Sequence, residues 1–107
     1  MSKALKSAQT LVALRDVRIS EHGYDEMAAD GISVGEILAG IKDAVLIEDY
    51  PEYGKGPCVL VLQKDRMGLP VHAVWGIPKN TKSPAVLVTA YRPDPERWEE
   101  GFLRRKS

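Results

Sequence analysis

The amino-acid sequence predicts an α+β fold in which N-terminal helices pack on a four-stranded antiparallel sheet and a short C-terminal helix follows. Apolar residues recur at helical spacing up to Ile41, whereas from Ala44 onward apolar and polar residues alternate as they do in strands. The connections between the expected strands are too short to hold crossover helices, so consecutive strands should pair antiparallel. A chain of 107 residues with 44% hydrophobic content should form a single domain over residues 1–107.

Three helices are expected before the sheet. The first is amphipathic, and the N-terminal stretch 1–17 that contains it is expected to be mobile at its start. Ser20 should cap the second helix, because a serine oxygen can accept from the free backbone amides of a first turn. Ser33 and Glu36 have the spacing of a capping box and should begin the third. The expected helices span residues 3–14, 21–29 and 34–41.

Four strands and a last helix are expected after them. Clusters of proline, glycine, asparagine and aspartate punctuate this half of the chain and mark its turns. Asp94 and Pro95 have the order of an N-cap and a first helical residue, so a helix should run from there to Leu103 and bury Trp98. The expected strands are Ala44–Tyr50, Cys58–Lys64, Pro70–Ile77 and Ala85–Arg92.

Strand alternation assigns residues to the two faces of the sheet. The third strand has four apolar residues at alternate positions, and these are expected on the core side: Val71, Ala73, Trp75 and Ile77. In the fourth strand the corresponding all-apolar set is Val86, Val88 and Ala90. This assignment places His72 and Tyr91 together on the opposite, open face, where a functional site is expected.

Composition excludes several classes of protein. No apolar run approaches the length of a membrane-spanning helix, and the N-terminal residues lack the pattern of a secretory leader, so a cytoplasmic protein without a membrane partner is expected. A single cysteine, Cys58, fits a reducing compartment. With one cysteine and two histidines no metal site is expected, and no motif for a cofactor is present.

The charges cancel overall but are strongly segregated. The chain has 15 basic and 15 acidic residues, which gives no general attraction to nucleic acid. Residues 20–52 hold one positive and nine negative charges, whereas residues 79–107 hold seven positive and four negative. If the basic parts meet in the fold, they could hold a phosphate backbone on a face turned away from the acidic helices. The alternative is that these charges simply face solvent.

His72 is the most informative single residue, because it is an ionisable group in an otherwise hydrophobic strand. Its pKa near neutrality suits a general acid or base, and the alternative is a structural hydrogen bond. Tyr91 could donate a proton or stack on a base, or be a half-buried strand aromatic. Arg92 could bind phosphate, or form an ion pair at the surface. His22, at the start of a helix, is a weaker candidate whose structural interpretation is favoured.

Four basic residues are candidates for contacts with phosphate. Two belong to the polar loop between the last two strands and two to the C-terminal part; they are Lys79, Lys82, Arg97 and Arg104. For each, the competing interpretation is a solvated surface residue. Cys58 has no neighbouring histidine or cationic cluster in the sequence, so a reactive thiolate is not expected.

Several segments together resemble a known family. They are Arg18-Ile-Ser-Glu-His22-Gly-Tyr-Asp-Glu-Met27, Asp30-Gly-Ile-Ser33, Ile47-Glu-Asp-Tyr-Pro51, Val71-His72-Ala-Val74 and Val88-Thr-Ala-Tyr91-Arg-Pro-Asp-Pro-Glu-Arg-Trp98. In order and spacing this set resembles a small bacterial and archaeal domain-of-unknown-function family related to the RelE-like and MqsR-like toxins. The resemblance implies the fold shared by barnase, EndoU, colicin and RelE, with a helical N-terminal part on a curved antiparallel sheet.

The resemblance also implies a function and partners. It implies metal-independent cleavage of RNA, on the ribosome or free, by a toxin that a cognate antitoxin of the small zinc-finger type keeps silent. The residues carried over by position are His22, His72 and Tyr91, with Arg92 in addition. Toxins of this kind are often strongly basic and this chain is not, which argues against tight non-specific RNA binding.

The sequence therefore predicts a toxin-like endoribonuclease, an mRNA interferase of a toxin–antitoxin system, with His72 in the chemistry. Two alternatives remain open. One is a non-catalytic module that binds a protein or RNA on the same fold, which the zero net charge favours. The other is a binder of a small molecule on the concave face.

Overall fold

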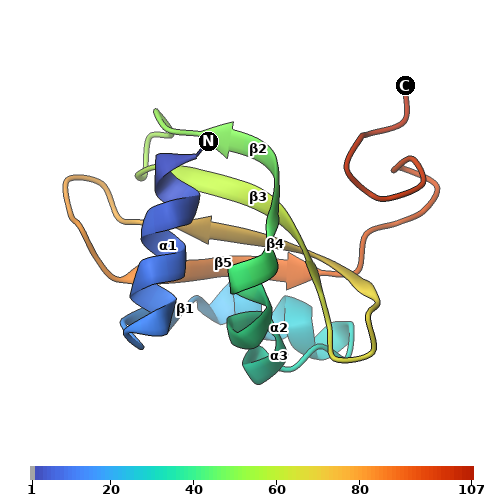
Figure 1. Ribbon diagram of the computed structural model, residues 1–107, viewed down its shortest axis with the longest axis horizontal. Coiled ribbons are helices and arrows are strands. Elements are labelled where there is room, and N and C mark those ends of the chain that lie inside the picture. Colours follow the sequence, from blue (N-terminus) through green and yellow to red (C-terminus); the bar gives the residue numbers. More distant parts are fainter. Residues whose placement is uncertain (1) are drawn as a thin grey trace.

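A computed structural model describes residues 2–107, and in it three helices accompany a five-stranded sheet (Figure 1). Met1, the first residue of the stretch expected to be mobile, lies outside the described residues. The radius of gyration is 12.9 Å, as expected for one folded domain of this length. The elements are α1 (Lys3–Ala13), β1 (Val17–Ile19), α2 (Glu21–Ala29), α3 (Val34–Gly40), the 3₁₀ turn η1 (Ile41–Asp43), β2 (Val45–Tyr50), β3 (Cys58–Lys64), β4 (Pro70–Gly76) and β5 (Ala85–Tyr91).

The sheet contains one strand more than the sequence predicted. Its order is β1-β5-β4-β3-β2, and β2 to β5 form the expected antiparallel meander. The additional strand, β1, pairs parallel with β5, with Val17 beside Ala85 and Ile19 beside Leu87. Three residues are too few to show a period of two, so alternation could not reveal this strand. It forms because its backbone groups pair with an edge that β5 already provides.

Both predicted serine caps are present. The Ser20 hydroxyl accepts from the Gly23 amide at 2.9 Å, and the Ser33 and Glu36 side chains form the reciprocal capping box. The third helix ends at Gly40 rather than Ile41, and the chain continues as a 3₁₀ turn. A β-carbon at Gly40 would stand 3.1 Å from the Lys64 carbonyl oxygen, so a larger residue would not allow this close approach to β3.

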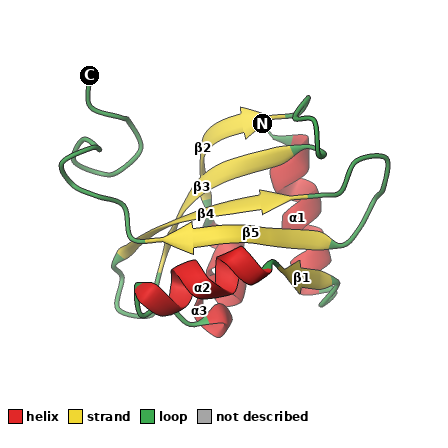
Figure 2. Cartoon of the chain, turned by 180° about the vertical axis from the view of Figure 1, so that it is seen from behind, coloured by secondary structure: helices red, strands yellow, loops and turns green. Residues whose placement is uncertain are grey.

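The helices occupy two places around the sheet. α1 and α3 lie against one face, and α2 lies beside β5, beyond the end of β1 (Figures 1 and 2). The approach of α2 to β5 is close, because Ser20 Oγ donates to the Val88 carbonyl oxygen at 2.6 Å and a β-carbon at Gly23 would be 3.0 Å from that oxygen. The helices therefore do not all stack on one face, and α2 covers an edge that β1 is too short to protect.

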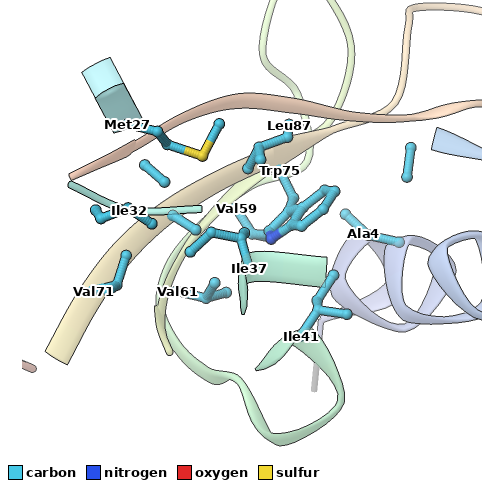
Figure 3. Packing of buried hydrophobic residues seen from close by; sticks show 14 residues of the cluster. Ala4, Met27, Ile32, Ile37, Ile41, Val59, Val61, Val71, Trp75 and Leu87 are labelled. Atoms are coloured by element: carbon cyan, nitrogen blue, oxygen red, sulfur yellow. The ribbon is translucent and has the colours of Figure 1, made fainter. Parts of the chain in front are cut away.

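The hydrophobic core lies between the sheet and the helices. Trp75 of β4 is at its centre, surrounded by residues from α1, α2, α3 and the neighbouring strands (Figure 3). The fully buried side chains include Met27, Ile37, Val59, Val61, Val71, Trp75 and Leu87. Burial of each such side chain contributes about 1.5–3 kcal/mol, so this layer supplies most of the favourable free energy of folding.

One buried polar residue joins the two layers. Gln63 Oε1 accepts from the Trp75 indole nitrogen at 2.9 Å, and Gln63 Nε2 donates to the Ile37 carbonyl oxygen at 2.9 Å. Gln63 is almost completely buried, so both of its polar atoms need partners from the protein. The two hydrogen bonds fix the Trp75 ring and tie the last turn of α3 to the sheet.

The predicted C-terminal helix does not form. Residues 93–107 make a series of turns closed by an isolated bridge between Trp98 and Arg105. Gly101 and Phe102 both have φ in the left-handed region, at 92° and 61°, which a right-handed helix cannot contain. Trp98 is buried, as expected, but it packs on the open face of the sheet instead of under a helix.

A bulge in β5 corrects the predicted faces of that strand. Val74 pairs with Thr89 and Trp75 pairs with Leu87, so Val88 has no partner on β4 and the alternation shifts by one position. As a result Leu87 and Ala90 both belong to the core, whereas Val88 is on the open face. Val86 also lies on the open face, so two of the three residues assigned to the core side were assigned wrongly.

Gly56, in the turn before β3, provides a test of this packing. It has φ of 124°, and a β-carbon there would overlap the Ile77 carbonyl oxygen and stand 2.6 Å from the Lys79 amide nitrogen. We expect Gly56→Ala to lower the free energy of unfolding by at least about 2 kcal/mol, measured by urea denaturation. The control is Gly54→Ala, two residues earlier, where a β-carbon meets nothing within 4 Å. Equal stability of the two variants would contradict the turn as described.

Candidate functional site

The open face of the sheet contains a hollow of about 730 Å³ (Figure 2 looks onto this face). Its walls come from β1 to β5, from the loop between β2 and β3 and from the C-terminal segment. Apolar side chains of β3, β4 and β5 form much of the floor. The charged and aromatic lining residues are Arg18, Glu48, Tyr50, Tyr53, Lys55, Tyr91 and Arg105.

Basic residues from distant parts of the chain meet at this hollow. Arg18 comes from β1, Lys55 from the loop before β3 and Arg105 from the C-terminal segment. The first two belong to no ion pair within residues 2–107. Tyr50 and Tyr53 are about half exposed beside them. Cationic groups next to exposed aromatic rings are the combination that proteins use to hold the backbone and bases of a single strand.

His72 and Tyr91 lie together on this face, as the strand alternation predicted. They are direct partners on β4 and β5, and their rings meet edge to face with centroids 5.7 Å apart. Burial raises the pKa of Tyr91; the positive charge of Arg105 opposes this effect, and the negative charges of Glu48 and Glu26 add to it. The phenol is therefore neutral at physiological pH and serves better as an aromatic or hydrogen-bonding surface than as a proton donor.

The C-terminal segment, residues 93–107, covers His72 completely. The imidazole is 0% exposed, its Nε2 lies 2.8 Å from the Phe102 carbonyl oxygen, and its ring meets the Trp98 ring at 4.4 Å. The segment leaves the end of β5 and runs back toward β2 (Figure 1). The open face of the sheet is thus closed at the end that holds the histidine and open at the end that holds Arg18.

The contact with Phe102 fixes the protonation of His72. A carbonyl oxygen can only accept, so Nε2 carries the hydrogen. Burial lowers the pKa of His72 below its ordinary value, and the hydrogen bond to Phe102 offsets this only in part. The neutral ring therefore leaves Nδ1 as an acceptor, and this atom is buried without a partner, as is the Thr89 hydroxyl. Buried polar atoms of proteins usually have a hydrogen-bond partner, either a protein group or an ordered water.

A second pair anchors the segment on β2. Arg105 donates to Glu48 through Nε and Nη2, both at 3.2 Å, and its guanidinium lies 4.7 Å over the Trp98 ring. The Tyr50 hydroxyl donates to the same carboxylate at 2.8 Å. The hydrogen bond from Arg105, together with that from Tyr50, lowers the pKa of Glu48. A carboxylate that stays ionised stands in the hollow beside His72.

The comparisons with known proteins give one match. The family described as a domain of unknown function, DUF4258, matches residues 19–92, about two thirds of the chain. The chain belongs to this family. The matched region contains β2 to β5 with His72, Tyr91 and Glu48, and it ends before the segment that covers the histidine. No curated protein and no solved structure matches the chain.

Arg92 does not join the DUF4258 residues on the open face. Its guanidinium pairs with Asp65 at 2.9 Å, and its backbone amide donates to Asp30 at 2.8 Å. Asp65 in turn accepts from the backbone amides of Met67 and Leu69 in the turn between β3 and β4. These contacts hold the end of β5 against that turn. Arg92 thus takes part in an ion pair, and its partner is the buried Asp65.

The other predicted residues lie around the site. His22 is largely exposed in the first turn of α2, where it lies 3.6 Å from Glu26. Lys79 and Lys82 are exposed in the loop between β4 and β5. Arg97 and Arg104 are exposed in the C-terminal segment, at the opposite end of the sheet from that loop (Figure 1). Their expected roles remain predictions.

Sequence reasoning missed Glu48 and Arg105, and it also missed four other residues that line the hollow: Arg18, Tyr50, Tyr53 and Lys55. Glu48 and Tyr50 have a spacing of two within a predicted strand, which places both on one face, and this signal was available. No local pattern marks Arg105, because it reaches the site only through the fold of the C-terminal segment. Cys58 also lines the hollow, and burial raises the pKa of its thiol, which does not favour a reactive thiolate.

Two other features of the described chain bear on function. No helix within residues 2–107 is long and apolar enough to cross a membrane. Nor does that part of the chain bring three or more histidine, cysteine, aspartate or glutamate side chains together as ligands for a metal ion.

The buried, neutral state of His72 predicts how stability depends on pH. Because the pKa of His72 is lowered in the folded protein, the unfolded chain binds its proton more readily, so stability should fall as pH drops through about 6.5. We expect His72→Gln, which keeps a hydrogen-bond donor, to flatten this fall between about pH 8 and about pH 5.5, measured by urea denaturation. His22→Gln is the matched control and should retain the wild-type slope. The same slope in all three proteins would show that His72 is not buried as a neutral group.

Proposed function

We propose that the protein is a metal-independent endoribonuclease that binds single-stranded RNA in the hollow on the open face. The observation that carries this proposal is the composition of the hollow. Two cations that form no ion pair within residues 2–107, Arg18 and Lys55, and two half-exposed rings, Tyr50 and Tyr53, line the hollow together with the ionised Glu48. These residues provide groups for phosphate, base stacking and proton transfer, and His72 lies under the C-terminal segment at one end of the same face.

The reaction needs a base and an acid on either side of a phosphodiester. The 2′-oxygen attacks the adjacent phosphorus, the base takes the 2′-hydroxyl proton, and the bond from phosphorus to the 5′-oxygen of the next nucleotide breaks. The acid gives a proton to that leaving 5′-oxygen. The products are a 2′,3′-cyclic phosphate and a 5′-hydroxyl end, and no metal ion takes part in this proton balance.

The residues divide these tasks according to their surroundings. Glu48 is the base, because it is ionised and lies in the hollow. His72 is the acid, once water reaches it and removes the burial that lowers its pKa. Tyr91 packs against the imidazole and orients it. Arg18, at the opposite end of the hollow, binds a phosphate further along the strand, a phosphate contact that the sequence led us to expect of Arg92.

The biological setting belongs to the same proposal. We propose that the enzyme acts in the cytoplasm as a toxin related to the RelE-like and MqsR-like proteins, and that a cognate antitoxin of the small zinc-finger type silences it. Support comes from the resemblance of the sequence and from the α+β arrangement of helices on an antiparallel meander. Binding of RNA on the ribosome or free in solution is compatible with an open face of this size.

A non-catalytic binding module is the second candidate, and one observation favours it. His72 is 0% exposed and tied to Phe102, so in this conformation no substrate reaches it. A protein that stays in this state could still bind RNA or a protein through the Arg18 end of the hollow. The two candidates differ in whether RNA is cut.

Induced expression in a bacterial host separates them. We expect growth arrest and discrete new RNA ends bearing 5′-hydroxyls with the wild type. Glu48→Gln and His72→Ala should each reduce the yield of these ends at least about a hundredfold, because each removes one partner of the proton transfer. The control for the charge change is Glu52→Gln, at an exposed residue in the turn after β2. Intact RNA in cells that contain folded wild-type protein would favour the binding module.

A further inference from the structure

We propose that the covered end of the open face is a subsite for one nucleotide of a single-stranded substrate, and that residues 98–105 of the chain itself fill it in this conformation. In this arrangement Trp98 stands in the place of a base, and the Phe102 carbonyl oxygen stands in the place of the leaving oxygen of the RNA backbone. The inference rests on the proposed function and names how its site is filled and opened.

The covering segment is held at few points. Among residues 94–107 only Trp98 is buried, Phe102 is half-buried and every other side chain is exposed. Two backbone hydrogen bonds, between Glu99 and Arg104 and between Lys106 and Arg97, close the loop on itself without using the sheet. Its side-chain anchors on the face are the Trp98 ring, the hydrogen bond from His72 and the pair between Arg105 and Glu48. A loop attached in this way can leave without unfolding the domain.

The anchors imitate a nucleotide group by group. The Trp98 ring meets the His72 ring at an interplanar angle of 86° with centroids 4.4 Å apart, so the subsite already accommodates a planar heteroaromatic ring against the imidazole. An oxygen that can only accept lies 2.8 Å from His72 Nε2, where the proposed reaction needs a backbone oxygen. Arg105 forms an ion pair with Glu48. A movement of the segment that uncovers His72 would therefore also release the Glu48 carboxylate from this pair.

In the closed arrangement two polar atoms of the sheet lack hydrogen-bond partners within residues 2–107. His72 Nδ1 and the Thr89 hydroxyl are buried without hydrogen-bond partners. Burial of such an atom without a partner disfavours the closed arrangement, and contact with water after the segment lifts would remove this cost. The closed state is therefore held by modest contacts and opposed by this cost, as expected of an occupant that a substrate can displace.

Competition between the segment and RNA has a measurable consequence. When the binding-competent state is a small fraction of the molecules, the apparent dissociation constant rises by the inverse of that fraction. A substitution that weakens the segment should therefore tighten RNA binding, although it removes a group from the protein. A substitution that removes a contact between the protein and RNA would instead weaken RNA binding.

The first measurement is the chemical accessibility of the two histidines. Diethyl pyrocarbonate acylates exposed neutral imidazoles, and peptide mass spectrometry separates His72 from the largely exposed His22, which acts as the internal reference. In the wild type we expect modification of His22 and protection of His72. In Trp98→Ala, His72 should react at a rate near that of His22, while the far-ultraviolet circular dichroism stays unchanged. Leu103→Ala, an exposed apolar residue of the same segment, should behave as the wild type.

The second measurement is affinity for a single-stranded deoxyuridine oligomer at fixed salt, because this probe lacks the 2′-hydroxyl and cannot be cut. We expect Trp98→Ala to bind it at least about tenfold more tightly than wild type or Leu103→Ala. Arg105→Ala should also bind more tightly than wild type. Arg104→Ala, which removes the same charge from the neighbouring exposed residue, should bind equally or more weakly. Reactive His72 in the wild type, or unchanged affinity in Trp98→Ala, would overturn the subsite.

The outcomes separate this inference from the proposed function. Tighter binding by Trp98→Ala with no RNA cleavage by any variant would support a covered nucleotide subsite and contradict the endoribonuclease. Cleavage by the wild type with unchanged affinity in Trp98→Ala would support the enzyme and contradict the segment as an occupant of its site.

Discussion

A hydrogen bond from the buried His72 ring to the Phe102 carbonyl oxygen determines the state in which this domain is seen. It draws the C-terminal segment over the sheet and places Trp98 on the imidazole. The Nε2 hydrogen of His72 is donated to Phe102. The histidine is neutral, because burial away from water lowers its pKa. The site on the open face therefore has two ends. The end with Arg18 is accessible, and the end with the proposed acid is closed by the protein's own chain.

This arrangement depends on β4 being buried on both faces. On the core side Trp75 is fixed by Gln63 of β3, which also holds α3, so β4 cannot shift along β3 without breaking the buried hydrogen bond between Trp75 and Gln63. On the open side His72 projects from the same strand two positions after its start. Rigid support from the core thus determines where the imidazole stands. The covering segment has no comparable attachment, and for this reason movement on the open face is expected in the segment and not in the sheet.

The sequence predicted the fold well where the signals were local and repeated. Serine caps at Ser20 and Ser33, the antiparallel meander and the shared face of His72 and Tyr91 all followed from spacing. Strand β1 did not follow from spacing, because it forms only by pairing with the edge of β5. Alternation also failed at Val86 and Val88, because the bulge at Val88 adds one residue and shifts the faces of the residues before it relative to those after it. At the site, Glu48 had a usable signal in its spacing from Tyr50. Nothing near Arg105 in the sequence could show that two left-handed residues turn the chain back over the sheet.

The most direct test of the covered histidine is a nitrogen-15 NMR spectrum of the two imidazole rings in the native protein. We expect His72 to be a fixed Nε2-protonated tautomer at neutral pH, with a nuclear Overhauser effect between its ring and that of Trp98. Its titration should lie below that of an exposed histidine, and His22 in the same sample should show averaged tautomers. A His72 ring with averaged tautomers, an ordinary titration and no contact with Trp98 would contradict the closed site at its centre.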